Sequence, residues 1–421
     1  MSDSYNEQQG IAFQHDVVGA YQAAGQVPDL LNVVWSNRMV WDARDLGYAA
    51  SRAKHLRELK RVLGLTDPRP LIETPRLTKG ERCLMAGDQR FHVRGVSAFR
   101  LAHMLVNGEE AAVDDYLGWC LDHKINWLRV FCMCKNMFEL PPGDGLRGLD
   151  LLAERTANTG LYVEAVALAD TFAYPTAFNP GGQVAYAGEV ASQYPHLTVE
   201  LVNEPGQKWQ LFTKDDLVRL AHVPVGVPFT LGAADGPNDE SREYCYGAAT
   251  YQNVHCDRTR APWGNVRHVR EQQVLSEEIK QYVIDDEPMN AKDLTEAQCF
   301  GLGALERICQ IGGTAHADWG KECRLPTAEE QRQFDARRRG WDSVPETFWG
   351  RFANFNWKAP LPESPVLAAV FNSDDARVYA SVTDTEGYAV LLHAESPMFK
   401  PGWSGRQVDG IGEASVWHCT R

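Results

Sequence analysis

The chain has 421 residues, of which 44% are hydrophobic and 23% are charged, as in an ordinary soluble globular protein. Its 42 basic and 56 acidic side chains give a formal net charge of −14, which argues against nucleic acid or an anionic membrane as a partner. The first residues contain no basic region and no apolar run, and nothing later reaches the roughly 20 apolar residues of a membrane span. We therefore expect no signal peptide, and a protein that is cytoplasmic or released by a non-signal route.

The cysteines are scattered and mostly lie inside apolar strand or helix patterns. They stand at positions 83, 120, 132, 134, 245, 256, 299, 309, 323 and 419. We expect reduced core residues, as in cytosolic proteins, and not a disulfide framework. Cys132 and Cys134 lack the second pair that a structural zinc site needs, so no metal is assigned to them.

Residues 1–80 do not follow a barrel pattern. Apolar residues from Leu46 to Leu63 recur at spacings of three and four, which predicts a helix that ends at Gly64, and a proline-rich linker follows at 67–70. We expect a helical extension that packs on the barrel or on a second subunit. The alternative is an attachment or oligomerisation module, which makes a homo-oligomer possible.

From residue 91 onward, strand and helix patterns alternate regularly. Strands are expected at 91–99, 126–133, 161–168, 197–202, 227–232, 250–255, 281–286 and 313–317. Helices are expected at 110–122, 146–157, 184–194, 214–222, 269–278, 294–309 and 327–339. Eight such units predict an α/β fold, a (β/α)8 TIM barrel over residues 81–345.

The pattern changes after the eighth unit. Short strands are expected at 366–371, 377–383, 387–393 and 414–419, with a hairpin turn at 384–387. Residues 346–421 are therefore expected to form a small C-terminal antiparallel β domain.

The fourth and seventh strands end in the same way, on a Glu-Pro pair. Residues 197–205 read Leu-Thr-Val-Glu-Leu-Val-Asn-Glu-Pro, and residues 281–288 read Gln-Tyr-Val-Ile-Asp-Asp-Glu-Pro. Proline lacks an N–H for the ladder and favours extended backbone before it, so Glu204 and Glu287 should project from the carboxyl ends of their strands. Those ends line one mouth of a barrel, where two carboxylates can cleave a glycosidic bond. The alternative for each is an acid that caps the following helix.

The run Val-Glu-Leu-Val-Asn-Glu-Pro resembles the strand-4 signature of the clan A glycoside hydrolases, the superfamily of (β/α)8 barrels that includes the family 5 cellulases and mannanases. The chain looks like a divergent member, and the resemblance covers about residues 90–340. It implies that Glu204 is the acid/base and Glu287 the nucleophile of a retaining β-glycosidase. It also implies an oligo- or polysaccharide substrate and no cofactor.

The resemblance further implies which residues bind the substrate. Arg129 lies in an otherwise apolar strand and would stand beside the nucleophile; the alternative is a buried structural ion pair. Asn203 would bind the sugar 2-hydroxyl, unless it only forms a turn. The other substrate-binding candidates at strand ends and in rim loops are Asp170, Trp209, His255, Trp263, His316 and Trp319.

Three of these positions need comment. Trp319 is the expected sugar platform, with a core tryptophan as the alternative. Asp170 stands where many family 5 members carry a histidine. The family has His-x-Tyr after the sixth strand, whereas here His255 precedes Cys256 and Asp257. Tyr251 or Tyr282 could replace the missing tyrosine.

Two other functions compete with the glycosidase. His255-x-Asp257 and His316-x-Asp318 both fall at strand ends, with further aspartates at 170, 285 and 286, which is a pattern that a metal-dependent barrel hydrolase could use. The second alternative is a non-catalytic carbohydrate-binding barrel. The residues leave open which sugar is bound and whether cleavage is internal or terminal.

Overall fold

A computed structural model describes most of the chain beyond residue 72. The described residues are 73–174, 179–206, 212–233, 243–255, 262–288, 293–349, 351–352, 378–392, 399 and 402–421. The helix expected before Gly64, the strand expected at 366–371 and Trp209 lie outside these ranges. The division into three parts at residues 80 and 345 stays a prediction.

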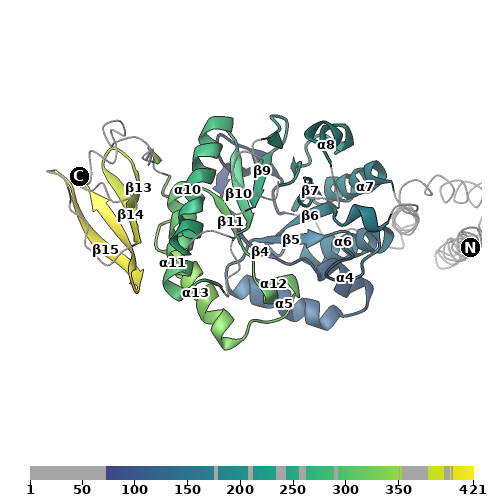
Figure 1. Ribbon diagram of the computed structural model, residues 1–421, viewed down its shortest axis with the longest axis horizontal. Helices are drawn as coiled ribbons and strands as arrows, with labels where there is room; N and C mark the ends of the chain where they lie inside the picture. Colours follow the sequence, from purple (N-terminus) through teal and green to yellow (C-terminus); the bar gives the residue numbers. More distant parts are fainter. Residues whose placement is uncertain are drawn as a thin grey trace, which may run out of the picture.

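Eight parallel strands form the centre of the molecule (Figure 1). They are β4 (Arg94–Ser97), β5 (Trp127–Phe131), β6 (Tyr162–Leu168), β7 (Leu197–Val202), β8 (Phe229–Thr230), β9 (Tyr251–His255), β10 (Tyr282–Glu287) and β11 (Gly312–Ala315). Their hydrogen-bonded order is β8-β7-β6-β5-β4-β11-β10-β9. The N–H of Thr250 donates to the carbonyl of Phe229 over 2.8 Å and links the two outer strands, so the sheet is a nearly closed barrel. This confirms the predicted fold class.

Helices surround the strands (Figure 1). They are α4 (Leu101–Val106), α5 (Glu110–Asp122), α6 (Pro142–Thr156), α7 (Pro180–Gln193), α8 (Lys214–Leu220), α10 (Pro262–Ile279), α11 (Glu296–Cys309), α12 (Asp318–Lys321) and α13 (Ala328–Asp342). The helices α8, α11 and α13 each begin after a threonine whose hydroxyl accepts a hydrogen bond from the third helical N–H, which satisfies a donor that the helix leaves unpaired. The short helices α4 and α12 were not predicted.

A three-stranded antiparallel sheet closes the amino end of the barrel. It consists of β1 (Leu77–Lys79), β2 (Leu84–Ala86) and β3 (Gln89–Phe91). Leu77 and Leu84 are buried in one cluster with the bases of the barrel strands, among them Trp127 and Tyr282. The prediction of one strand over 91–99 is therefore wrong, because the pairing of β2 with β3 ends at Phe91 and the barrel strand starts at Arg94. The small sheet thus covers the base of the barrel.

A five-stranded antiparallel sheet follows the barrel, as predicted, and lies beside α10 and α11 (Figure 1). Its strands are β12 (Arg351–Phe352), β13 (Val378–Val382), β14 (Glu386–Leu392), β15 (Ser404–Ile411) and β16 (Ala414–Thr420). Val390 and Val416 of this sheet share a buried cluster with Phe300 of α11. The C-terminal sheet is thus packed on the helical layer by apolar contacts.

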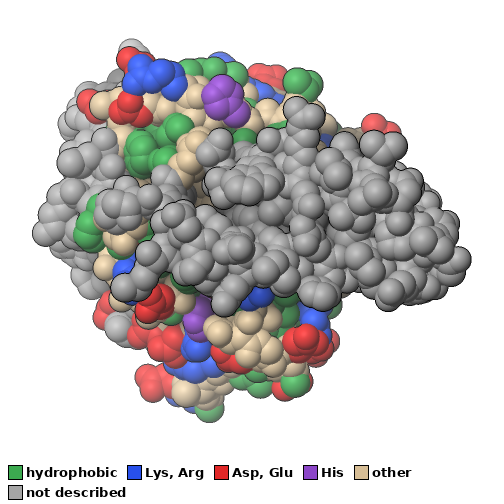
Figure 2. Space-filling model, turned by 90° about the vertical axis from the view of Figure 1, so that its right-hand side faces the viewer, with side chains coloured by type: hydrophobic (Ala, Val, Ile, Leu, Met, Phe, Trp, Pro, Cys, Tyr) green, Lys and Arg blue, Asp and Glu red, His purple; other side chains and the backbone are tan. Residues whose placement is uncertain are grey.

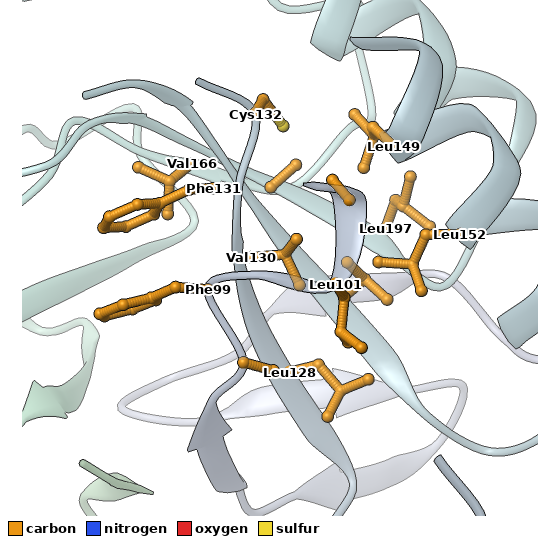
Figure 3. Packing of buried hydrophobic residues seen from close by; sticks show 14 of the residues in the cluster. Phe99, Leu101, Leu128, Val130, Phe131, Cys132, Leu149, Leu152, Val166 and Leu197 are labelled. Carbon is orange, nitrogen blue, oxygen red and sulfur yellow. The ribbon is translucent and has the colours of Figure 1, made fainter. Parts of the chain in front are cut away.

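The strand β5 shows how side-chain alternation separates the two faces of the barrel wall. Leu128 and Val130 point outward and meet Leu101 of α4 and Leu152 of α6, whereas Phe131 points to the other side, next to Phe99 (Figure 3). The rings of Phe99 and Phe131 are stacked, with 4.1 Å between their centroids. Arg129 shares the inward parity of Phe131, so the barrel interior receives a charged side chain.

The nine cysteines in the described ranges are all free, and eight of them are buried, which agrees with the reduced core residues that we expect; Cys256 lies outside these ranges. No described helix is long and apolar enough to cross a membrane. On the coloured part of the face in Figure 2, acidic and basic side chains are interspersed, so the charge there is mixed.

The helices α11 and α13 pack closely because glycines face each other across their contact. A Cβ added at Gly340 would lie 2.2 Å from the carbonyl oxygen of Phe300 and 2.7 Å from the backbone nitrogen of Ala304. Backbone atoms cannot move aside as a flexible side chain can, so the helices would have to separate.

We therefore expect Gly340→Ala to lower the free energy of unfolding by about 1–3 kcal/mol, as overpacking of a filled core does. The control is Gly118→Ala, because Gly118 lies in α5 with no atom within 4 Å of an added Cβ. That change should be neutral or stabilise by up to about 1 kcal/mol, since alanine is the better helix former. Urea unfolding of both variants measures the difference, and equal midpoints would contradict the close packing.

Candidate active site

Arg129 lies at the centre of the candidate site and is fully buried. Its Nε and Nη2 donate to the two oxygens of Glu200 over 2.7 and 2.8 Å. Its Nη1 donates to Oε1 of Glu287 over 2.7 Å, and Nη2 also donates to Oδ1 of Asn203 over 2.8 Å. Arg129 thus has both of the roles that the sequence suggested for it: it forms a buried ion pair with Glu200, and it touches Glu287.

A β-bulge in β10 places a further acid here. Asp285 pairs with Val254 of β9, but the next pair is Glu287 with His255, so Asp286 is the extra residue. A bulge puts two consecutive residues opposite one partner, and it can re-aim a side chain. Asp286 and Glu287 therefore both turn to the interior, where Oδ2 of Asp286 lies 2.9 Å from Nε of Arg129.

Glu204 follows β7 and is held by His255. The Nδ1 atom of His255 lies 3.0 Å from Oε1 of Glu204, within hydrogen-bond distance. The φ angle of Glu204 is 48°, so its backbone is left-handed and the extended conformation expected before Pro205 is wrong. Such a conformation costs on the order of 1 kcal/mol in a residue with a side chain, and it is kept where surrounding contacts fix it.

The two glutamates of the Glu-Pro pairs come together. Carboxylate oxygens of Glu204 and Glu287 lie within 4.8 Å of one another, and a ring nitrogen of His255 lies within the same distance of both. The side chain of Glu204 is 15% exposed and that of Glu287 is 7% exposed, whereas Arg129 behind them is not exposed. The pair therefore lies between the solvent and the buried charges.

His316, at the end of β11, is the second histidine of the site. Its Nε2 lies 3.9 Å from Oε2 of Glu287, and its Nδ1 lies 3.0 Å from the hydroxyl of Ser97. The hydroxyl of Ser97 comes from β4, so the strands at one side of the barrel fix this ring. Glu287 thus has Arg129 at one oxygen and His316 near the other.

A layer of buried acids surrounds Arg129. Glu164 accepts hydrogen bonds from the indole of Trp127 and from Tyr251 and Asn253, at 3.2, 2.8 and 2.9 Å. Burial and the charge of Asp286 raise the pKa of Glu164 to about 7, against the opposing effect of Arg129.

The pKa values of Glu200 and His255 are shifted as well. Burial raises the pKa of Glu200, although its bidentate pairing with Arg129 opposes this. Burial alone would lower the pKa of His255, but the charges of Glu287 and Asp286 outweigh it and raise that pKa well above its usual value. The site is therefore built to keep His255 positively charged near neutral pH.

Several predicted substrate-binding residues are not in the site. Trp319 is 1% exposed and packs edge-on against Trp119 and Phe334 beneath the rim, so its predicted role as a sugar platform is wrong and the core alternative holds. Trp209 and the side chain of Trp263 lie outside the described residues.

Asp170 also has another role than the one predicted. Its Oδ2 accepts hydrogen bonds from the N–H groups of Lys135 and Asn136, both over 2.8 Å, and its Oδ1 accepts from the side chain of Asn136. These contacts hold the loop after β5, so Asp170 is a structural residue and the assignment to substrate binding is wrong.

Neither tyrosine replaces the one missing after the sixth strand. The hydroxyl of Tyr251 contacts Glu164 and Thr198, and the hydroxyl of Tyr282 contacts the N–H of Val93. Both rings lie in the cluster at the closed base of the barrel, because residues 251 and 282 are the first of their strands. In place of that tyrosine, His255 and His316 approach Glu287.

Sequence reasoning missed Glu164 as a member of the site and considered Asp286 only as a metal ligand. A signal for the first was present, since Glu164 is a lone charge in the apolar run Tyr-Val-Glu-Ala-Val-Ala-Leu of β6, as Arg129 is in β5. Buried charges in neighbouring strands favour each other as partners. No comparable signal marks the bulge at Asp286.

In the described part of the chain, two groups of side chains could offer ligand atoms to a cation: Glu204 with His255 and Glu287, and Glu164 with Glu200 and Asp286. The guanidinium of Arg129 already lies against members of both groups, and a positive charge there disfavours a metal ion. The donor sets are therefore better suited to an ion-pair network.

Among the described residues, two members of the set expected for a metal-dependent hydrolase lie away from the site. Asp318 pairs with Lys321 over 3.1 Å in α12, and Asp285 faces the helices, toward His268 and Gln272 of α10. Asp257 lies outside the described residues.

No family model and no curated protein matches this chain. Among solved structures, a glycoside hydrolase family 5 from Bacteroides vulgatus ATCC 8482 is similar over 82% of this chain and 93% of its own, with a TM-score of 0.56 and 13% identity. A structure described as a glycoside hydrolase is similar over 82% of this chain and 97% of its own, with a TM-score of 0.57 and 11% identity. At this identity the likeness shows a shared fold, in agreement with the observed strand order.

Proposed function

We propose that this protein is a glycoside hydrolase that cleaves β-linked glycans with retention of anomeric configuration. One observation carries the proposal: carboxylate oxygens of Glu204 and Glu287 lie within 4.8 Å of one another at the carboxyl ends of β7 and β10. Retaining enzymes use carboxyl groups about 5–5.5 Å apart, whereas inverting enzymes need about 6.5–9.5 Å to admit a water molecule. The fold shared with glycoside hydrolases supports the same class.

The reaction has two displacements. In the first, an oxygen of Glu287 attacks the anomeric carbon, the bond to the leaving oxygen breaks, and that oxygen takes the proton of Glu204. In the second, the carboxylate of Glu204 takes a proton from water, whose oxygen attacks the anomeric carbon and releases Glu287. No cofactor takes part in either step.

The neighbouring residues position this pair. Arg129 donates to Glu287 and Asn203, so it fixes the nucleophile and aims the amide that we expect at the sugar 2-hydroxyl. His255 donates to Glu204 and stabilises the carboxylate that remains after proton transfer. His316 stands near the second oxygen of Glu287 and could contact a hydroxyl of the same sugar.

The stereochemistry of the product tests the proposal. A panel of aryl β-glycosides and neutral β-linked polysaccharides identifies a substrate, and proton NMR then follows the first sugar released. We expect the β anomer to form first and the α anomer only later, by mutarotation. Initial release of the α anomer would show inversion, and activity that a chelator removes would favour a metal-dependent hydrolase.

A further inference from the structure

Asp286 has two partners in the site and is itself fully buried. Its Oδ2 lies 2.9 Å from Nε of Arg129, and its Oδ1 lies 3.3 Å from Nε2 of His255. The bulge in β10 brings this carboxylate to the interior together with Glu287. Asp286 therefore lies between the partner of the nucleophile and the partner of the acid/base.

His255 is held between two carboxylates. Its Nδ1 faces Glu204 and its Nε2 faces Asp286. A neutral imidazole carries only one N–H and could donate to one of them, whereas an imidazolium donates to both. Oδ1 of Asp286 lies 3.3 Å from Nε2, so its negative charge favours the imidazolium, which keeps an N–H at Nδ1 for Glu204.

We propose that Asp286 is a positioning residue which, through His255, keeps a hydrogen-bond donor on the acid/base Glu204. This inference rests on the proposed role of Glu204 and adds a third carboxylate to the mechanism. When Glu204 gives up its proton, the N–H at Nδ1 of His255 stabilises the new carboxylate. When Glu204 takes a proton from water, the same contact keeps its side chain in place.

Arg129 alone does not explain Asp286. The guanidinium already makes hydrogen bonds to Glu200, Glu287 and Asn203. A further buried acid adds repulsion with Glu200 and Glu287, and such a charge is unfavourable unless another positive group meets it. His255 is that group, since it lies against the oxygen of Asp286 that does not face Arg129.

The variant Asp286→Asn tests the inference because it keeps the shape and removes the charge. Among the residues that the structure describes, the charged groups that face His255 are Glu204 from the end of β7 and Asp286 and Glu287 from β10, with Arg129 of β5 beyond them. With Asp286 neutral, we expect the pKa of His255 to fall by about one unit or more, since a close opposite charge shifts a pKa by that amount.

Two measurements follow from this change. The imidazole of His255 is titrated by nitrogen NMR, with His255→Asn identifying its signals, and this readout needs no substrate. In kinetics, we expect kcat of Asp286→Asn to fall roughly 10- to 100-fold with little change in KM, less than loss of the general acid itself. A new ionisation should also enter its pH profile near neutrality.

The adjacent acid supplies the control. Asp285 is equally buried in the same strand but faces the helices, so Asp285→Asn should leave the titration of His255 and the pH profile as in the wild type. If Asp286 acts through His255, adding Asp286→Asn to His255→Asn should lower kcat little further. Multiplied losses in the double variant, or an unchanged His255 titration in Asp286→Asn, would overturn the inference.

The two proposals fail differently. A wild-type protein that hydrolyses no glycoside contradicts the proposed function, while the titration of His255 still tests its contact with Asp286. An active wild type whose Asp286→Asn variant keeps its rate and pH profile contradicts the positioning role only.

Discussion

Glu287→Ala is expected to abolish hydrolysis of every substrate, with kcat lowered on the order of 10⁴-fold or more, because no nucleophile remains to form the glycosyl-enzyme. Glu204→Ala is expected to depend on the leaving group. An aryl glycoside that releases a weakly basic phenol needs no proton, so its first displacement should survive, whereas an unactivated glycan should lose about 10²–10⁴-fold. Steady-state kinetics on both substrates separates the two roles.

Azide gives a second readout of the same pair. In Glu287→Ala, azide can occupy the space of the lost carboxylate and attack the anomeric carbon once, which yields the α-glycosyl azide. In Glu204→Ala, azide can take the place of water on the glycosyl-enzyme, which yields the β-glycosyl azide. The same anomer from both variants, or equal losses on activated and unactivated substrates, would contradict the assignment of nucleophile and acid/base.

Arg129→Met is expected to have the largest effect on folding. It leaves Glu200, Asp286 and Glu287 without their buried cation, and removal of one partner from a buried ion pair costs about 3–5 kcal/mol. Urea unfolding at several pH values measures the loss. Arg129→Lys keeps the charge but cannot reproduce the forked contacts, so it should fall between the wild type and Arg129→Met.

The stability lost in Arg129→Met should increase as pH rises. Glu164 and Glu200 already have pKa values raised above those of the unfolded chain, to about 7 and about 8. Through these two groups the folded protein binds more protons than the unfolded one between about pH 4.5 and pH 8, so their contribution to stability falls as pH rises through that window. Without the opposing charge of Arg129 the pKa values of Glu164 and Glu200 rise further. The stability lost in Arg129→Met should therefore be larger at pH 8 than at pH 5. Adding Glu200→Gln to Arg129→Met should restore part of the lost stability. A loss of stability that does not depend on pH would contradict this account.

The parts of the fold with the clearest local signals were predicted best. The helix α5 and the strand β7 have the predicted ends, at Glu110–Asp122 and Leu197–Val202, because a regular apolar pattern stops abruptly at polar or proline residues. The abrupt stop of two apolar strands at a Glu-Pro pair likewise predicted that Glu204 and Glu287 lie at the carboxyl ends of their strands.

The remaining features depend on contacts that a local pattern does not contain. The strands of the sheet that closes the barrel base are three residues long, too short for alternation to show. Trp319 is buried by Phe334 of α13 and by Trp119, which lies far from it in sequence. The bulge at Asp286 is defined by the register of β10 against β9, so the sequence of β10 alone does not predict it.

The small sheet at the amino end covers the base of the barrel. Leu77 and Leu84 pack there in one cluster with aromatic rings at the bases of the barrel strands. Arg129 and the acids Glu164, Glu200 and Asp286 have no exposed surface. Charges buried in a protein interior interact more strongly than charges in water, so the ion pairs of Arg129 act where electrostatic forces are strongest.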